Sequence, residues 1–264
     1  MIKLTHISLF SGIGGIDIAA EWAGFETILF VEKNEYCQKV LKKHWPDVPI
    51  IGDIRDVKGD EIQRPITIIS GGFPCQDVSI AGKREGLRGH RSTLWEEFYR
   101  IVCKVKPRWV LVENVRGLLS SDNGQFLGAI LRDLARIRYD AEWGVLRASW
   151  FRIPQDRDRI FIIAYPSQFS KQAVFYKDTI NVESYREGMD GKGCKSSNTN
   201  YENNRESTVP VLGDTQRAEI PNRERSGNDD GIPHRVDRLR CLGNAVVPQQ
   251  IYPILKAIAD IESL

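Results

Sequence analysis

The sequence predicts an α/β protein with a doubly wound, mostly parallel sheet. Short runs of β-branched and apolar residues alternate along residues 4–163 with longer segments in which apolar side chains recur at helical spacing. Several of the predicted strands end directly in glycine or in an acidic residue. Open α/β sheets place their binding sites at the carboxyl ends of such strands, so these strand ends are where we expect the functional residues.

Length and composition restrict the function classes. A chain of 264 residues suits one large domain, or one domain with a small appendage, and a net charge of +2 requires any nucleic acid to meet a local basic patch. The five cysteines are scattered, with no CxxC or Cys/His cluster, so we expect reduced thiols and no metal site. We find no leader-like segment and no apolar run long enough to cross a bilayer. We therefore expect a soluble, cytoplasmic protein without a membrane partner.

The first strand, residues 4–10, leads into Ser11-Gly12-Ile13-Gly14-Gly15 and then a helix over residues 16–23. Glycines let a backbone approach a ligand closely, and a helix N-terminus attracts an anionic group. The second strand, residues 27–31, ends in Glu32, about 20 positions after the first glycine. This spacing suits the ribose of an adenosine-containing cofactor, nicotinamide or otherwise, although the glycines alone also fit a tight structural turn.

A helix over residues 34–44 and a strand over residues 50–54 follow. Asp53 could accept a hydrogen bond from an adenine amine or cap a turn, and its position favours neither. The next strand, residues 65–69, breaks at Gly71-Gly72-Phe73-Pro74-Cys75. Cys75 could be a nucleophile if its pKa is lowered. A small buried hydrophobe is the other interpretation, and the one that this stretch favours when taken alone.

Residues 81–91 are rich in glycine and basic residues, which fits either a solvated loop or a loop that closes over a phosphate backbone. A helix over residues 92–103 precedes an apolar strand, residues 109–112, which runs into Glu113-Asn114-Val115. Burying an unpaired Glu is costly, which favours a functional Glu113.

A helix over residues 126–138 precedes a strand at the end of residues 151–163. Strand alternation would place Gln155, Arg157 and Arg159 on one side, as a basic edge or as a surface salt-bridge ladder. Residues 167–231 change sharply in composition and resemble a long insertion or small irregular lobe, and a final helix with Ile251, Ile254, Leu255, Ile258 and Ile261 packs back on the sheet.

In this order, five motifs resemble the S-adenosylmethionine-dependent cytosine-C5 DNA methyltransferases. They are Phe10-Ser11-Gly12-Ile13-Gly14-Gly15, Gly71-Gly72-Phe73-Pro74-Cys75-Gln76, Glu113-Asn114-Val115, Gln155-Asp156-Arg157-Asp158-Arg159 and Gly243-Asn244-Ala245-Val246. The resemblance spans residues 9–165 and resumes over residues 238–249. It implies a Rossmann-like methyltransferase fold with a small irregular target-recognition lobe.

The resemblance also implies S-adenosylmethionine as the cofactor. Phe10 would pack on its adenine, Glu32 would bind its ribose, Asp53 its adenine amine, and Asn244 would close the pocket. The full set of implied cofactor-binding residues is Phe10, Ser11, Gly12, Gly14, Glu32, Asp53, Ile54, Pro74 and Asn244.

For catalysis the resemblance implies that the Cys75 thiolate adds to C6 of a cytosine and Glu113 binds the N3 edge of the base. Arg159 would contact the base carbonyl, and Arg157, which we place in the catalytic set, would hold backbone phosphate together with Ser79. The base is expected to be flipped out of the duplex. The implied nucleic-acid contacts are Ser79, Lys83, Arg84, Arg88, Arg91 and Gln155.

We thus expect a catalytic and cofactor-binding domain over residues 1–166, a variable target-recognition segment over residues 167–236, and a C-terminal segment, 237–264, that returns to the catalytic domain. We expect the partner to be double-stranded DNA and the protein to be a monomer. It would act in a bacterial or phage-infected cell, as part of a restriction-modification system. Two alternatives stay open: a tRNA cytosine-5 methyltransferase, because the segment before Arg238 is short, and a non-catalytic nucleic-acid-binding relative. Two features depart from the family pattern: no helix is evident before Gly243, and Lys33 stands where many members have an aromatic residue.

Overall fold

The computed structural model describes residues 3–59, 62, 64–74, 93–151, 153, 157–169 and 235–263. Seven of the residues expected to act lie outside these ranges, namely Cys75, Ser79, Lys83, Arg84, Arg88, Arg91 and Gln155. The same holds for most of the predicted target-recognition segment.

The described residues form one seven-stranded sheet with the order β3-β2-β1-β4-β5-β7-β6. Its strands are β1 (Leu4–Leu9), β2 (Phe25–Val31), β3 (Ile50–Ile51), β4 (Ile68–Gly71), β5 (Trp109–Val115), β6 (Tyr139–Arg147) and β7 (Asp158–Pro166). Pairings among the first five strands are parallel, whereas β7 runs antiparallel to both β5 and β6. The prediction of a mostly parallel sheet is confirmed.

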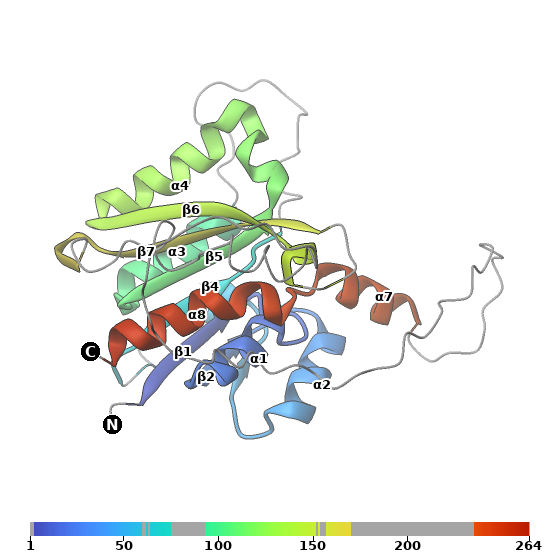
Figure 1. The fold of residues 1–264 in the computed structure, drawn as a ribbon. Coiled ribbons are helices and arrows are strands. Elements are labelled where there is room, and N and C mark those ends of the chain that lie inside the picture. Colours follow the sequence, from blue (N-terminus) through green and yellow to red (C-terminus); the bar gives the residue numbers. More distant parts are fainter. Residues whose placement is uncertain are drawn as a thin grey trace, which may run out of the picture.

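Helices cover both faces of the sheet (Figure 1). They are α1 (Gly15–Trp22), α2 (Glu35–His44), α3 (Thr93–Val105), α4 (Gln125–Arg136), α7 (Arg235–Asn244) and α8 (Pro248–Glu262). Apolar residues of α3 and α4, among them Trp95, Phe98 and Ile130, form one core with the sheet. Residues of α1 and α8 form a second core on the opposite face, which includes Ile254 and Ile258. The doubly wound arrangement follows because the central strands β4, β5 and β7 are buried on both faces and need cover on both.

Most predicted elements are confirmed within two or three residues, but the strand expected at residues 50–54 ends at Ile51. Asp53 adopts an extended conformation and caps a 3-10 helix, Ile54–Asp56, so the chain turns away from the sheet there. The strand predicted to end at Glu113-Asn114-Val115 includes all three of these residues, because β5 continues to Val115 by pairing with β7.

Two elements were not predicted. The strand β6, with the sequence YDAEWGVLR, includes three charged residues and a glycine, and it forms because its full length pairs with the apolar β7. The helix α7 lies directly before Ala245, where no helix was evident from the sequence. Its largest apolar side chains, Val236, Leu239 and Leu242, are exposed, so it lacks the apolar face by which a helix is recognised.

No helix in the described part of the chain is both long and apolar enough to span a membrane.

Candidate active site

The glycine turn after β1 is shaped by left-handed backbone at Phe10, Gly12 and Gly14, with φ of 53°, 57° and 87°. A Cβ on Gly14 would lie 2.6 Å from the ring of Trp45, so both backbone conformation and space require glycine there. A Cβ on Gly12 would meet nothing within 4 Å. The turn is therefore packed on its α2 side and open at Gly12, which leaves space for a ligand against the backbone.

Glu32 connects this turn to the start of α2. Its Oε2 accepts a hydrogen bond from the Gly12 N–H at 2.7 Å, and its Oε1 accepts one from the Asn34 N–H at 2.7 Å. The Gln38 amide donates to the Glu32 carbonyl. The carboxylate is thus held beside the glycine turn, and its remaining lone pairs could accept hydrogen bonds from ligand hydroxyls. The structure brings together the two features that the 20-residue spacing linked.

Asp53 acts as a cap in the structure. It accepts hydrogen bonds from the backbone N–H of Arg55 and from the Arg55 guanidinium, and Lys33 Nζ lies 3.7 Å from its Oδ2. The hydrogen bonds from Arg55 hold the pKa of this carboxyl well below its usual range. The neighbouring predicted residue, Ile54, is buried in the α3 core and its carbonyl accepts from Arg100.

After β4 the chain passes between β1 and β5 with almost no clearance. A Cβ on Gly71 would lie 2.4 Å from the Leu9 carbonyl oxygen, and one on Gly72 would lie 2.6 Å from Glu113 Oε2. The Asn114 amide donates to the Phe73 carbonyl at 3.1 Å, and the Phe73 ring packs against Trp95 and Phe126. The backbone is therefore fixed up to Pro74, the residue before Cys75.

Glu113 and Arg159 form a buried ion pair across β5 and β7. Arg159 Nε lies 2.9 Å from Glu113 Oε1, but its N–H is not aligned on that oxygen, which finds no hydrogen-bond donor in the described part of the chain. Burial raises the pKa of Glu113, and the charges of Arg159 and Arg157 oppose that rise. A buried carboxyl oxygen without a donor is uncommon, so Glu113 is suited to receive an N–H group from a ligand.

Arg157, which was expected to hold phosphate, binds the backbone at the end of α7. Its two Nη atoms donate to the carbonyls of Gly243 at 2.7 Å and Ala245 at 2.6 Å. Burial and the nearby Arg159 charge lower its pKa. Because β7 begins only at Asp158, the predicted alternation does not extend to Arg157, and Arg157 and Arg159 reach different partners.

The segment after α7 lies against the N-terminus of α1, since a Cβ on Gly15 would fall 2.3 Å from the Val246 carbonyl oxygen. Asn244, the last residue of α7, is thus two residues from a direct contact with the glycine turn. The side chain of Gln250 adds a further tie, donating to the Leu146 and Arg157 carbonyls.

Two residues that position the site were given no role by the sequence reasoning. Asn114 fixes the Phe73 carbonyl, and Gln250, fully buried, holds the chain beside Arg157. The signal for Asn114 was its place beside Glu113 at a strand end. We see no signal for Gln250.

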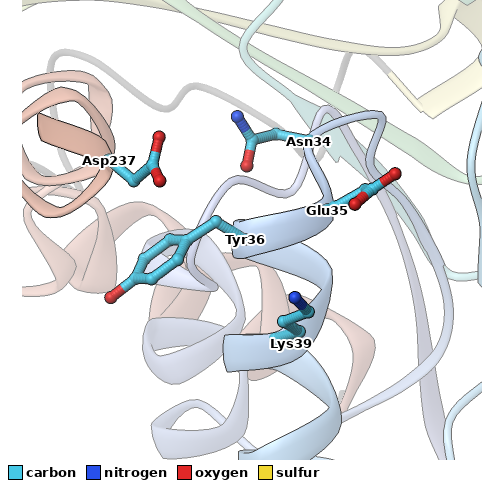
Figure 2. A pocket seen from close by; sticks show the side chains of 5 residues that line it. All are labelled: Asn34, Glu35, Tyr36, Lys39 and Asp237. Carbon is cyan, nitrogen blue, oxygen red and sulfur yellow. The ribbon is translucent and has the colours of Figure 1, made fainter. Parts of the chain in front are cut away.

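A cavity of about 430 Å³ lies between α2 and α7. Figure 2 shows Asn34, Glu35, Tyr36 and Lys39 on the α2 side and Asp237 of α7 facing them. Asn34, which lines the cavity, also donates a hydrogen bond to Glu32. The cavity therefore lies beside Glu32 and not at the Glu113–Arg159 pair. No group of three or more His, Cys, Asp and Glu among the described side chains is arranged to hold a metal ion.

The chain is 36% identical over 162 residues to the type II methyltransferase M.Eco47II of Escherichia coli, covering 61% of this chain and 39% of that protein. It is 37% identical to M.AquIA of Picosynechococcus, covering 60% and 70% of the two chains. The chain spans less than half the length of M.Eco47II and of M.DsaV.

Among solved structures, a DNA modification methyltransferase encoded within an E. coli prophage is 27% identical with a TM-score of 0.55, covering 63% of this chain and 48% of the other. Spodoptera frugiperda DNMT2, 21% identical with a TM-score of 0.53 over 63% of this chain and 51% of its own, shares the fold. A model of the C-5 cytosine-specific DNA methylase family matches residues 4–234. The chain therefore belongs to the C-5 cytosine-specific DNA methylase family.

Proposed function

We propose that the protein transfers a methyl group from S-adenosylmethionine to C5 of a cytosine in double-stranded DNA, within a restriction-modification system. The observation that supports this most directly is the buried Glu113–Arg159 pair beside Gly72-Phe73-Pro74, the segment that leads to Cys75. The relatives are named type II methyltransferases, which fits the same reaction.

S-adenosylmethionine would bind at the glycine turn. Glu32, held by the Gly12 and Asn34 backbone N–H groups, would accept hydrogen bonds from the ribose hydroxyls, and the open side of Gly12 would admit the ligand. Phe10, Ser11, Gly14 and Pro74 would complete the contacts, with Asn244 closing the pocket from the end of α7. The cofactor supplies an electrophilic methyl group on a sulfonium.

Asp53 and Ile54 would contribute less directly than the resemblance implies. Asp53 already binds Arg55, so its carboxylate would contact an adenine amine only through its remaining lone pairs. Ile54 is buried in the core that includes α3, and it would support the proposed cofactor pocket through its packing there.

The chemical steps assign one task to each side chain. The Cys75 thiolate adds to C6, which raises electron density at C5, and Glu113 binds the N3 edge of the ring as negative charge develops. C5 would then take the methyl group from the sulfonium, which releases S-adenosylhomocysteine. The C5 proton leaves to a base, and the Cys75–C6 bond breaks to restore the ring. A buried Glu113 with a raised pKa keeps its proton more readily and can donate it to N3.

Arg159 would contact the base carbonyl while its charge balances Glu113. Arg157 would serve by holding the Gly243 and Ala245 carbonyls, which fixes the segment that closes the cofactor pocket. Asn114 would position Cys75 through the Phe73 carbonyl. Ser79, Lys83, Arg84, Arg88, Arg91 and Gln155 remain proposed DNA contacts around a flipped base.

We further propose that residues 1–166 with 237–264 form the catalytic unit, that residues 167–236 recognise the target sequence, and that the protein acts as a monomer in the cytoplasm of a bacterial or phage-infected cell.

The test is methyl transfer from labelled S-adenosylmethionine to double-stranded DNA and to tRNA, with Cys75→Ser as the control. We expect label on DNA with the unaltered protein and none with Cys75→Ser, and a covalent adduct with 5-fluorocytosine DNA that requires Cys75. Label on tRNA alone would contradict the DNA assignment. Absence of label on both substrates would favour a non-catalytic nucleic-acid-binding protein.

A further inference from the structure

Two cysteines outside the proposed catalytic set face each other between α2 and α7. Cys37 Sγ and Cys241 Sγ are 3.1 Å apart, although 204 positions separate them in the chain. Both side chains are buried, with exposed fractions of 5% and 7%, and both are free thiols. A disulfide bond has an S–S length of about 2.05 Å, so an approach of about 1 Å would allow the two sulfurs to bond.

The cysteine pair lies between two residues of the proposed cofactor site, Glu32 before α2 and Asn244 at the end of α7. On α2, the Cys37 N–H donates to the side chain of Asn34, whose own N–H holds Glu32 Oε1. On α7, Cys241 is three residues before Asn244 and two before Gly243, whose carbonyl binds Arg157. The cavity of Figure 2 opens between the same two helices.

We propose that Cys37 and Cys241 form an oxidative modification site, at which a two-electron thiol oxidant such as a peroxide converts the pair to a disulfide that joins α2 to α7. One thiolate attacks a peroxide oxygen, the O–O bond breaks, and the sulfur becomes a sulfenic acid as hydroxide leaves. The second thiol then attacks that sulfur, the S–S bond forms and water leaves. Each sulfur is oxidised by one electron, and the peroxide is reduced to two waters.

Neighbouring groups set the speed of this reaction. Burial and the neighbouring thiol raise the pKa of Cys37 above its usual range, and the Glu32 carboxylate acts in the same direction. Arg240 opposes that rise. Since the thiolate is the reactive form, the pair is expected to stay reduced under mild conditions and to oxidise faster as pH rises.

The disulfide would also affect how the cofactor site opens, an inference that rests on the proposed function. It would hold α7, with Asn244 at its end, against the helix that follows Glu32. Because the sulfurs are already close, the bond would change the shape of the pocket little and mainly restrict its opening. We therefore expect the oxidised protein to release S-adenosylhomocysteine at least about threefold more slowly than the reduced protein, as expected when a binding site is rigidified in its bound form.

The first test uses Cys75→Ser/Cys103→Ser/Cys194→Ser, in which Cys37 and Cys241 are the two remaining cysteines. After treatment with hydrogen peroxide, we expect both thiols to be lost and tryptic peptides 34–39 and 241–256 to be joined, with reversal by dithiothreitol. Thermal unfolding should shift upward by several degrees on oxidation. Recovery of two free thiols, or a sulfinic acid without cross-linked peptides, would overturn the proposal.

Adding Cys37→Ala to that variant provides the matched control, because alanine fills most of a small buried apolar site. It should give no cross-linked peptide and no oxidation-dependent change in thermal unfolding. If this variant does not fold, peptide mapping of the oxidised unaltered protein decides whether Cys37 and Cys241 are joined. The peptide that contains Cys103, which should not be joined to either, is the internal comparison.

The second test separates this proposal from the proposed function. Release of S-adenosylhomocysteine is followed from the reduced and the oxidised triple variant. If neither form binds it, the cofactor assignment fails while the cross-linked peptides still establish the modification site. If the reduced form binds and oxidation leaves the release rate unchanged, the effect on the cofactor is refuted.

Discussion

At the scale of single residues, the Glu113–Arg159 and His6–Asp17 pairs are buried for different reasons. Glu113 is 7% exposed and pairs with Arg159 at the edge of the proposed active site. His6 of β1 and Asp17 of α1 are fully buried and join a hydrogen-bonded network with Ser8, Thr27 and Ser70. The first pair suits chemistry, whereas the second ties α1 to three neighbouring strands.

Replacing Glu113 with Gln should remove most of the catalytic activity with little effect on folding. Glutamine keeps the shape but cannot give a proton to the base, and the loss of one such transition-state contact reduces kcat by on the order of 10²- to 10³-fold. Single-turnover methyl transfer to DNA measures this, with S-adenosylhomocysteine affinity as the control. A large loss of cofactor affinity at unchanged chemistry would contradict the role of Glu113.

Asp17→Asn should change how stability depends on pH. Burial raises the pKa of Asp17 from its ordinary value of 3.8 to about 7, and the Ser8 and Thr27 hydrogen bonds only partly oppose this. Between these two values the folded state binds more protons at residue 17 than the unfolded state, so this group's contribution to stability is lost as pH rises through about 7. His6, whose pKa burial lowers from 6.5 to about 3, acts in the opposite direction and loses stability as pH falls.

The free energy of unfolding of Asp17→Asn, relative to that of the unaltered protein, should therefore increase from pH 4 to pH 7 and stay level above that range. Urea unfolding at pH 5 and pH 8 tests this. The difference would be independent of pH if Asp17 were ionised in the folded protein throughout.

At the scale of elements, the glycine turn, α1 and the end of α7 fit together through backbone contacts. Gly15 is the closest point, because a Cβ there would meet the Val246 carbonyl oxygen at 2.3 Å. A backbone oxygen cannot rotate away as a flexible side chain can, so α1 or the segment after α7 would have to move.

Gly15→Ala should therefore destabilise the fold by about 1–3 kcal/mol, as overpacking does, and weaken cofactor binding as well. Gly128→Ala is the matched control, because it lies within α4 with no atom within 4 Å of its added Cβ. Alanine is the better helix former by about 0.8–1 kcal/mol, so Gly128→Ala should stabilise. Urea unfolding of both variants measures the contrast, and equal effects would refute the contact.

The sequence predicted those elements whose side chains show a clear pattern. Helix α3 buries Trp95, Phe98 and Ile101 at helical spacing, and β5 begins with four consecutive apolar residues, 109–112. The strand β6 was missed because seven of its nine residues are exposed or only partly buried, and its pairing with β7 determines its conformation. The pattern also could not show that Arg157 binds carbonyls at the end of α7, since that contact joins residues more than 80 positions apart.

At the scale of the molecule, the last helix completes a core built mainly by the first 170 residues. Helix α8 packs beside α1, with Ile251, Ile254, Leu255 and Ile258 fully buried on the same face of the sheet (Figure 1). The first 170 residues and helix α8 therefore share one hydrophobic core.

Ile258→Ala should lower the free energy of unfolding by about 2–5 kcal/mol, since it leaves a cavity in a closely packed core. Ile261→Ala, one turn further along α8 and only partly buried, should cost much less. Chemical unfolding should show one cooperative transition in each variant. Separate transitions for the N-terminal part and for α8 would contradict a shared core.

The hydrogen bonds of Arg157 to Gly243 and Ala245 have a consequence for how such a protein can diverge. They join the residue before β7 to the end of α7, two points that are 86 and 88 positions apart in the chain. Changes of length or sequence between residues 170 and 234 need not disturb the position of either tie. On the proposed function, exchange of that stretch alone would change the DNA sequence recognised and leave the proposed active site in place.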